Sequence, residues 1–179
     1  KTSCSLISAG TERMLLNFGN SNIIQKAKKH PDKVKEAINK MIIDGPVATL
    51  DAVNNKLNEP IPLGYSNVGE IIAKGDNVSC FKVGDKVVSN GPHAEYVLVN
   101  KNLCAKIPNN VADEEAVFTV LASIGLQGIR LAEPTIGETF VVCGLGLIGL
   151  LTAQILKANG VNVFGLDIDD RKIKIAKDL

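Results

Sequence analysis

The stretch Thr139-Phe140-Val141-Val142-Cys143-Gly144-Leu145-Gly146-Leu147-Ile148-Gly149 decides the fold of this 179-residue chain. An apolar run typical of a buried strand ends at a glycine, and three glycines then follow in the pattern G-x-G-x-x-G. Apolar residues recur at helical spacing up to Asn159-Gly160, and a second apolar run, 161–166, ends at Asp167. The sequence therefore predicts a strand, a glycine turn, a helix, a second strand and an acidic residue in succession.

Each part of this pattern has a physical role in binding a dinucleotide. Gly144 permits the tight turn out of the strand, Gly146 lets the backbone approach a pyrophosphate, and Gly149 lets the helix pack closely on the sheet. The helix N-terminus offers N–H groups and a positive dipole end to the phosphates. Asp167, 23 residues after Gly144, can accept hydrogen bonds from ribose hydroxyls. A glycine-rich turn in an ordinary βαβ unit is the alternative, which so complete a pattern disfavours.

Composition excludes several classes of protein. The net charge is +1 and 45% of the residues are hydrophobic, so no bulk electrostatic field favours nucleic acid or a membrane surface. No apolar run approaches the roughly 20 residues that a membrane-spanning helix needs. The four cysteines are scattered without a C-x-x-C pair, which disfavours a disulfide framework and excludes a structural zinc knot. We therefore expect a cytoplasmic protein that binds neither nucleic acid nor a membrane.

Both ends of the chain predict that it is part of a longer protein. Lys1 is not an initiator methionine, and the first residues already have the pattern of a strand. A doubly wound dinucleotide domain needs two mononucleotide-binding halves, and the sequence contains the pattern of the first half only. We expect the isolated chain to be an incomplete enzyme with an open sheet edge.

Before the glycine turn, the sequence changes from helical to strand-like patterns. A short strand leads into a turn-like polar cluster, Ser8-Ala9-Gly10-Thr11-Glu12, and residues 20–58 are predicted to be helical. Pro31 suits a first helical turn, and Asp44-Gly45-Pro46 interrupts the helical pattern. One apolar stripe precedes the interruption and a shorter one follows it: Val34, Ile38, Met41 and Ile42, then Leu50, Val53 and Leu57. The lysine surplus in 20–43 indicates either an anion-binding face or the solvated side of amphipathic helices.

The middle of the chain predicts a small β structure followed by a helical bridge. Strands are expected at 68–73, 86–88, 94–99 and 103–107, with glycine-marked bends between them, as in a small barrel or sandwich. Asp113 is expected to cap a helix that runs through Leu121, and a second helix is expected over 124–131.

Four segments resemble the medium-chain dehydrogenase/reductase superfamily. They are Pro62-Leu63-Gly64-Tyr65-Ser66-Asn67-Val68-Gly69-Glu70-Ile71, Phe81-Lys82-Val83-Gly84-Asp85-Lys86-Val87, Ala94-Glu95-Tyr96 and Gly165-Leu166-Asp167-Ile168-Asp169. The resemblance implies a chain of class α/β and β. A GroES-like barrel would occupy 1–110, with a helical insertion at about 20–58. A helical bridge and the first half of a Rossmann domain would occupy 111–179.

The insertion, together with Ser8-Ala9-Gly10-Thr11-Glu12 and Pro62-Leu63-Gly64-Tyr65-Ser66-Asn67, resembles the threonine-dehydrogenase-like or bi-domain oxidoreductase subgroup. Some members of that subgroup carry a second oxidoreductase domain. The resemblance therefore implies a small-molecule substrate, a homo-oligomer, and a fused or partner oxidoreductase domain.

The zinc ligands of alcohol dehydrogenases are missing from the matching positions. By resemblance, Ala9 replaces a cysteine, Tyr65 a histidine and Ser66 a glutamate, so we expect no zinc. Thr11 and Tyr65 are the candidate catalytic residues, because a hydroxyl can donate to a developing alkoxide. The alternative is that Tyr65 fills the volume left by zinc and Thr11 caps a turn. Of the two histidines, His30 is interpreted as solvated, and His93 as a loop residue that is more often structural than catalytic.

The resemblance implies a nicotinamide-dependent oxidoreductase acting on an alcohol or carbonyl compound. NAD is the expected cofactor rather than NADP, since Asp167 would repel a 2′-phosphate. Arg171 and Lys172 follow it and are expected to face solvent; the alternative is that one of them turns in and offsets the charge of a phosphate. The predicted cofactor-binding residues are Gly144, Leu145, Gly146, Leu147, Ile148, Gly149, Asp167, Ile168 and Lys172. The alternatives are a non-catalytic dinucleotide-binding or structural module, and a basic helical docking module based on residues 20–43.

Overall fold

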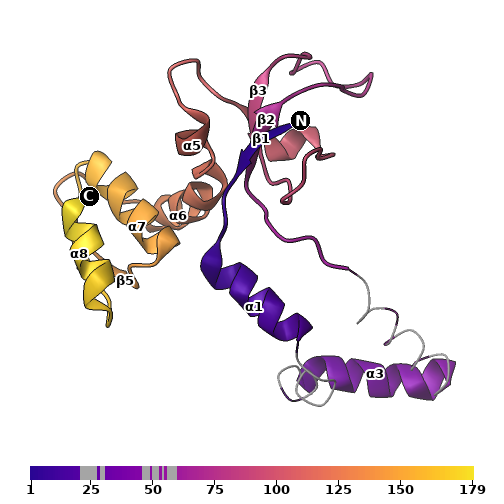
Figure 1. Ribbon diagram of the computed structural model, residues 1–179. Coiled ribbons are helices and arrows are strands. Elements are labelled where there is room, and N and C mark those ends of the chain that lie inside the picture. Colours follow the sequence, from indigo (N-terminus) through magenta and orange to yellow (C-terminus); the bar gives the residue numbers. More distant parts are fainter. Residues whose placement is uncertain (21–27, 29–30, 46–48, 50–52, 54, 56–59) are drawn as a thin grey trace. The chain divides into compact units, whose positions relative to one another are not determined.

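The computed structural model describes residues 1–20, 28, 31–45, 49, 53, 55 and 60–179. The chain divides into two compact units. One consists of Lys1–Ile7 with Gly64–Leu179, and the other is Ser8–Leu63. Elements carry the labels of Figure 1.

Most of the described residues of the Ser8–Leu63 unit are helical. Helix α1 spans Ala9–Gly19, so the prediction of a turn-like cluster at its start is wrong. The reason is a local cap: the backbone N–H of Ser8 donates to Oε1 of buried Glu12 at 2.8 Å, which ties down the first turn. Helix α3 spans Pro31–Asp44, beginning at the predicted proline.

The predicted stripe of α3 is only partly buried. Val34 and Met41 are half-buried, whereas Ile38 and Ile42 are exposed. Leu50 and Leu57 of the second predicted stripe lie outside the described residues, as do residues 21–27 and 29–30 of the lysine-rich run.

A four-stranded antiparallel sheet forms the first part of the larger unit. Its strands, in spatial order, are β1 (Thr2–Ser5), β2 (Asn67–Glu70), β3 (Lys86–Ser89) and β4 (Cys104–Lys106). Val68 pairs with Val88 in the register of β2 and β3, and both side chains are buried. Burying a valine side chain stabilises a fold by roughly 1.5–3 kcal/mol. The short 3-10 helix η1 (Lys101–Leu103) leads into β4.

The strand predicted at 94–99 does not form. Residues 93–96 are bends, and this segment joins the sheet through bonds to Thr2: the Thr2 N–H donates to the Glu95 carbonyl, and the Thr2 hydroxyl donates to the Ala94 carbonyl. The Leu98 side chain, within the predicted strand, is fully exposed. The local sequence has strand propensity, but these contacts do not continue into a ladder.

The helical bridge begins at a different residue from the one predicted. Helix α5 spans Asp113–Ala116 and α6 spans Thr119–Ala132, with Ala112 rather than Asp113 at the N-cap position of α5. The Asp113 carboxylate instead accepts hydrogen bonds from the Ser3 hydroxyl at 2.8 Å and Lys86 Nζ at 3.1 Å. This contact joins the first turn of α5 to strands β1 and β3.

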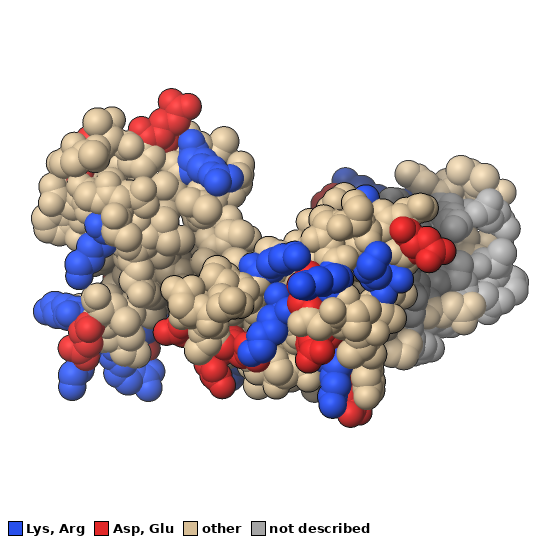
Figure 2. Space-filling model, turned by 90° about the horizontal axis from the view of Figure 1, so that it is seen from above, with Lys and Arg blue, Asp and Glu red and all other residues tan. Residues whose placement is uncertain are grey.

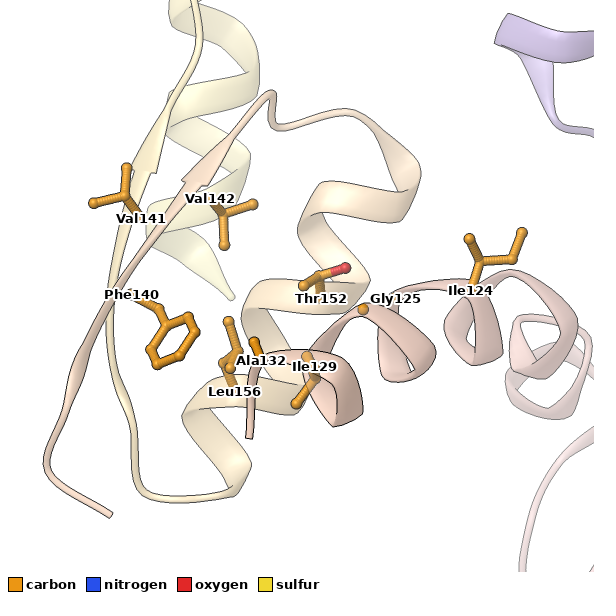
Figure 3. A pocket seen from close by; sticks show the side chains of 10 residues that line it. Ile124, Gly125, Ile129, Ala132, Phe140, Val141, Val142, Thr152 and Leu156 are labelled. Atoms are coloured by element: carbon orange, nitrogen blue, oxygen red, sulfur yellow. The ribbon is translucent and has the colours of Figure 1, made fainter. Parts of the chain in front are cut away.

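The βαβ unit forms as predicted. Strand β5 (Thr139–Cys143) leads through the glycine turn to α7 (Leu147–Ala158), both labelled in Figure 1, and β6 (Asn162–Leu166) pairs in parallel with β5. Helix α8 (Asp170–Asp178) follows. Helix α6 packs against α7, and an apolar pocket of about 270 Å³ lies among α6, α7 and β5. Phe140 and Val142 point into it, whereas Val141 points away (Figure 3).

Charged side chains are mixed over the surface. Among the described residues displayed in Figure 2, Lys and Arg side chains are interspersed with Asp and Glu. This is the surface expected for a net charge of +1. Within the described residues, no helix is both long enough and apolar enough to cross a membrane.

Candidate dinucleotide-binding site

The glycine turn between β5 and α7 has the geometry that its sequence predicts. Gly144 has φ of 93°, in the left-handed region that favours glycine. A Cβ on Gly149 would lie 1.8 Å from the carbonyl oxygen of Gly144, so only a glycine lets α7 start this close to the strand end. Around Gly146, by contrast, a Cβ would meet nothing within 4 Å. The backbone is therefore open at the glycine that would face a pyrophosphate.

Helix α7 starts directly at this open backbone. Gly146 is its N-cap residue, and Leu147 and Ile148 form the first helical positions. The first N–H groups of a helix have no intrahelical acceptor, and the dipole adds positive potential there. The turn and the helix start together suit an anionic group such as a phosphate.

Asp167 lies immediately after β6, and its side chain is 6% exposed. Its Oδ1 accepts a hydrogen bond from the Asp169 backbone N–H at 2.9 Å, and its Oδ2 accepts one from the Leu145 N–H at 2.8 Å. The pKa of the Asp167 carboxyl lies below its usual value of 3.8. The hydrogen bond from the Asp169 N–H contributes most to this lowering, the bond from the Leu145 N–H contributes next, and Lys172 contributes less. The N-cap of α8 is Asp169, so Asp167 is not a simple helix cap.

The two basic residues after Asp167 differ in their contacts. The Lys172 side chain is 44% exposed, yet its Nζ lies 3.3 Å from Asp167 Oδ2, so it is the one of the two basic residues that turns in toward the carboxylate. Arg171 is almost fully exposed and binds Asp169 through Nε and a terminal nitrogen. Among the described contacts, Asp167 therefore has Lys172 as its counter-ion, and Asp169 has Arg171.

A cavity of about 410 Å³ lies at the carboxyl ends of the two parallel strands, lined by Gly144, Leu166, Asp167 and Ile168. Ligands of open α/β sheets bind at this edge. The Ile168 side chain is fully exposed there. The structure thus brings three of the predicted cofactor residues, Gly144, Asp167 and Ile168, to one cavity.

Leu145 has a role that the sequence pattern did not reveal. Its side chain is buried, and a Cβ on Gly165 would lie 2.8 Å from Leu145 Cδ2. The side chain therefore packs on β6 and is not available to a ligand. A glycine inside a strand signals a close approach of this kind, and Gly165 was the signal in the sequence.

The two candidate catalytic residues lie in different units. Thr11 is in the first turn of α1, where its Oγ1 lies 3.5 Å from the Ser8 hydroxyl. Tyr65 follows Gly64, two residues before strand β2 begins, and is half-buried. Their cooperation at one site remains a prediction.

The residues that the resemblance aligns with zinc ligands offer few donor atoms for a metal ion. The hydroxyl of buried Ser66 donates to the Val117 carbonyl, and Ala9 has no donor atom. Within the described part of the chain, no three His, Cys, Asp or Glu side chains are grouped to hold a metal ion. His93 Nδ1 lies 2.8 Å from the Ser5 hydroxyl, and its ring is packed against the backbone of Gly64.

Comparison with known proteins agrees with the fold. Residues 40–109 match the alcohol dehydrogenase GroES-like domain. The chain is 29% identical to an alcohol dehydrogenase of Moraxella sp. (strain TAE123), over 93% of this chain and 60% of that protein. Its structure resembles an Escherichia coli CFT073 protein described as a short chain alcohol dehydrogenase, complexed with NADH, with a TM-score of 0.57 and 28% identity. That match covers 65% of this chain and 44% of the other.

A mycobacterial protein complexed with NADPH is similar to the same extent, with a TM-score of 0.58 and 28% identity over 69% of this chain and 42% of the other. An antiparallel GroES-like sheet joined to a βαβ unit with a dinucleotide-type turn defines a class of two-part nucleotide-binding proteins. The chain is similar to medium-chain dehydrogenases/reductases through its GroES-like segment and through its alcohol dehydrogenase relative. It spans 60% and 57% of the lengths of two curated relatives.

Proposed function

We propose that the protein is a nicotinamide-dependent oxidoreductase of the zinc-independent medium-chain type, acting on a small alcohol or carbonyl compound. The observation that carries this proposal is the Asp167 carboxylate, which lies on a cavity next to the Gly144 turn at the carboxyl ends of β5 and β6. Such a site suits the adenosine ribose and pyrophosphate of a dinucleotide. The bound cofactor would supply hydride chemistry, and the chain would supply binding and orientation.

NAD is the cofactor that the charges favour. The lowered pKa of Asp167 keeps its carboxylate ionised at neutral pH. An ionised carboxylate accepts hydrogen bonds from ribose hydroxyls but repels a 2′-phosphate. The adjacent cation, Lys172, is already paired with this carboxylate, which reduces the positive charge that it offers to a phosphate. Solved relatives include one with NADH and one with NADPH, so the preference of this chain rests on its own residues.

Substrate activation would depend on a hydroxyl rather than on a metal. The donor set at the zinc-ligand positions contains Ser66, whose proton is engaged by the Val117 carbonyl, and Tyr65. We assign the phenol of Tyr65 or the hydroxyl of Thr11 to donate a hydrogen bond to the substrate oxygen. In this assignment, a hydroxyl group polarises the substrate oxygen in the way that a zinc ion would in a zinc-dependent relative.

The further properties that we propose come from the sequence. They are membership of the threonine-dehydrogenase-like or bi-domain subgroup, a cytoplasmic location, a homo-oligomer, and a longer protein that completes the Rossmann domain. The GroES-like and helical segments would occupy 1–110, and the bridge with the first Rossmann half 111–179. The isolated 179 residues should accordingly show little turnover.

The test is cofactor binding followed by turnover in the full-length protein. NADH fluorescence should change saturably on binding, and a panel of alcohols and ketones should change absorbance at the reduced-cofactor band. Binding with no turnover of any panel member would favour the non-catalytic dinucleotide-binding module instead. Absence of NADH and NADPH binding would contradict both.

A further inference from the structure

Three successive residues, Gly165 and Leu166 at the end of β6 and Asp167 directly after it, contact the glycine turn. The Gly144 N–H donates to the Leu166 carbonyl at 2.7 Å, which extends the parallel ladder by one residue. The Leu145 side chain packs on Gly165. The Leu145 N–H then donates to Asp167 Oδ2 at 2.8 Å. The turn is therefore attached to β6 through a ladder bond, an apolar contact and a side-chain hydrogen bond.

The hydrogen bond from the Leu145 N–H to Asp167 differs from the other two contacts, because Asp167 is the residue that would bind the ribose. Asp167 uses one oxygen for the Leu145 N–H and the other for the Asp169 N–H. A carboxylate has about four acceptor positions, so both bonds can persist while ribose hydroxyls bind the remaining ones. Lys172, at 3.3 Å, is the longest-range partner of the carboxylate.

On its other side Gly146 is joined to α7, since its carbonyl accepts the Leu150 N–H at 2.9 Å, and the space that a Cβ on Gly146 would occupy is open. The Gly146 N–H lies at the junction of the turn and the helix, so its orientation depends both on α7 and on how firmly the preceding residue, Leu145, is held by Asp167. Preorganised donors bind an anion more tightly, because less conformational freedom is lost on binding.

We propose that Asp167 is a positioning residue for the phosphate-binding turn as well as the ribose-binding residue. This inference rests on the proposed dinucleotide function. Its carboxylate fixes the Leu145 N–H, and through it the backbone that faces the pyrophosphate. Adenosine recognition and pyrophosphate binding are thus coupled through one side chain, and a substitution that removes the carboxylate loosens both.

The first test measures amide hydrogen exchange by NMR in the cofactor-free, full-length protein. Asp167→Ala should speed exchange of the Leu145 amide by about tenfold or more, because its acceptor is gone. The matched control is Asp169→Ala, which removes a neighbouring carboxylate but leaves the Leu145 bond in place. Unchanged Leu145 exchange in Asp167→Ala would overturn the proposal. Should that variant fail to fold, Asp167→Glu moves the oxygens outward and should give intermediate exchange; exchange equal to that of the unmodified protein would overturn the proposal.

The second test measures the binding of inorganic pyrophosphate. For this probe, the charge of Asp167 and its positioning of the turn change the affinity in opposite directions. Removing a negative charge should by electrostatics alone tighten binding of the anion. Loss of the positioned turn should weaken it, and we expect about threefold to tenfold weaker binding by Asp167→Ala. Tighter or equal binding would contradict the positioning role. If the unmodified protein binds neither NADH nor NADPH, the proposed function fails, and the exchange comparison still decides the positioning role.

Discussion

The carbonyl oxygen of Gly144 occupies the space that a side chain on Gly149 would need, at 1.8 Å from an added Cβ. Helix α7 and strand β5 therefore approach as closely as their backbones permit. We expect Gly149→Ala to lower the free energy of unfolding by about 2–3 kcal/mol, since backbone atoms rather than a flexible side chain must move. It should also abolish NADH binding by shifting the start of α7.

The control is Gly128→Ala in α6, where an added Cβ would meet nothing within 4 Å. An alanine in an open helical position should raise stability by about 0.5–1 kcal/mol. Urea unfolding of both variants measures the difference. Equal effects at Gly149 and Gly128 would show that close packing at the turn is not the constraint.

The Asp113 carboxylate should stabilise the junction of the sheet and the bridge. It accepts hydrogen bonds from the Ser3 hydroxyl and from Lys86, and its side chain is 17% exposed. Asp113→Ala should reduce the free energy of unfolding by about 1 kcal/mol, because it removes the shorter of the two hydrogen bonds of the Ser3 hydroxyl, which keeps only the Val68 carbonyl at 3.2 Å, and the bond from Lys86. Glu114→Ala, which removes the adjacent exposed carboxylate, should change stability by less than about 0.5 kcal/mol. A reversed order of the two effects would contradict this account.

Stability should fall in acid through several aspartates whose pKa values lie below the ordinary 3.8. The largest causes are the Lys106 hydrogen bond for Asp85, the Ser3 hydrogen bond for Asp113 and the Asp169 N–H for Asp167. A carboxyl with a lowered folded-state pKa stabilises the fold fully above its unfolded pKa, and this contribution is lost as the pH falls through the folded value. The urea midpoint should therefore change little between about pH 7 and 5 and fall below about pH 4. A midpoint that rises on acidification below pH 4 would contradict the assignment.

Local sequence patterns predicted the βαβ unit correctly because its determinants lie within about 30 residues. The run 139–143, the glycines and Asp167 each impose a backbone geometry without help from distant residues. The start of α1 was missed because Glu12 reaches back four residues to the Ser8 N–H, and the polar cluster between them has turn-like composition.

Long-range contacts could not be predicted from such patterns. The segment 94–99 has the composition of a strand, yet its bonds to Thr2 involve only Ala94 and Glu95. Asp113 resembled a helix cap, but its carboxylate bonds to Ser3, 110 residues earlier. The Leu145 bond to Asp167 connects two predicted site residues through a geometry that spacing alone does not specify.

The hydroxyl of Tyr65 provides a test of metal-free substrate activation. In the full-length enzyme, Tyr65→Phe should lower kcat by about 100-fold or more if the phenol donates to the substrate oxygen, because a positioned proton donor contributes about that much. The chain has one other tyrosine, Tyr96, which is exposed, and Tyr96→Phe is the control. Unchanged kcat in Tyr65→Phe together with a large loss in Thr11→Val would assign the role to Thr11. Unchanged kcat in both variants would show that these side chains only fill space.

Elemental analysis tests whether the protein contains zinc. The full-length protein should contain no stoichiometric zinc, because Ala9 and Ser66 occupy ligand positions without suitable donors and the Ser66 proton is bound by Val117. Dialysis against a chelator should leave turnover unchanged. One tightly held zinc per chain, with activity lost on its removal and restored on its return, would contradict the zinc-independent assignment.

The central claim is that a nicotinamide dinucleotide binds at the carboxyl ends of β5 and β6, with its adenosine ribose on Asp167. Equilibrium binding of NADH and NADPH to the full-length protein and to Asp167→Ser tests this claim most directly. The unmodified protein should bind NADH at least about tenfold more tightly than NADPH, and Asp167→Ser should reduce or remove that preference. Tighter binding of NADPH by the unmodified protein, or binding of neither nucleotide, would contradict the account.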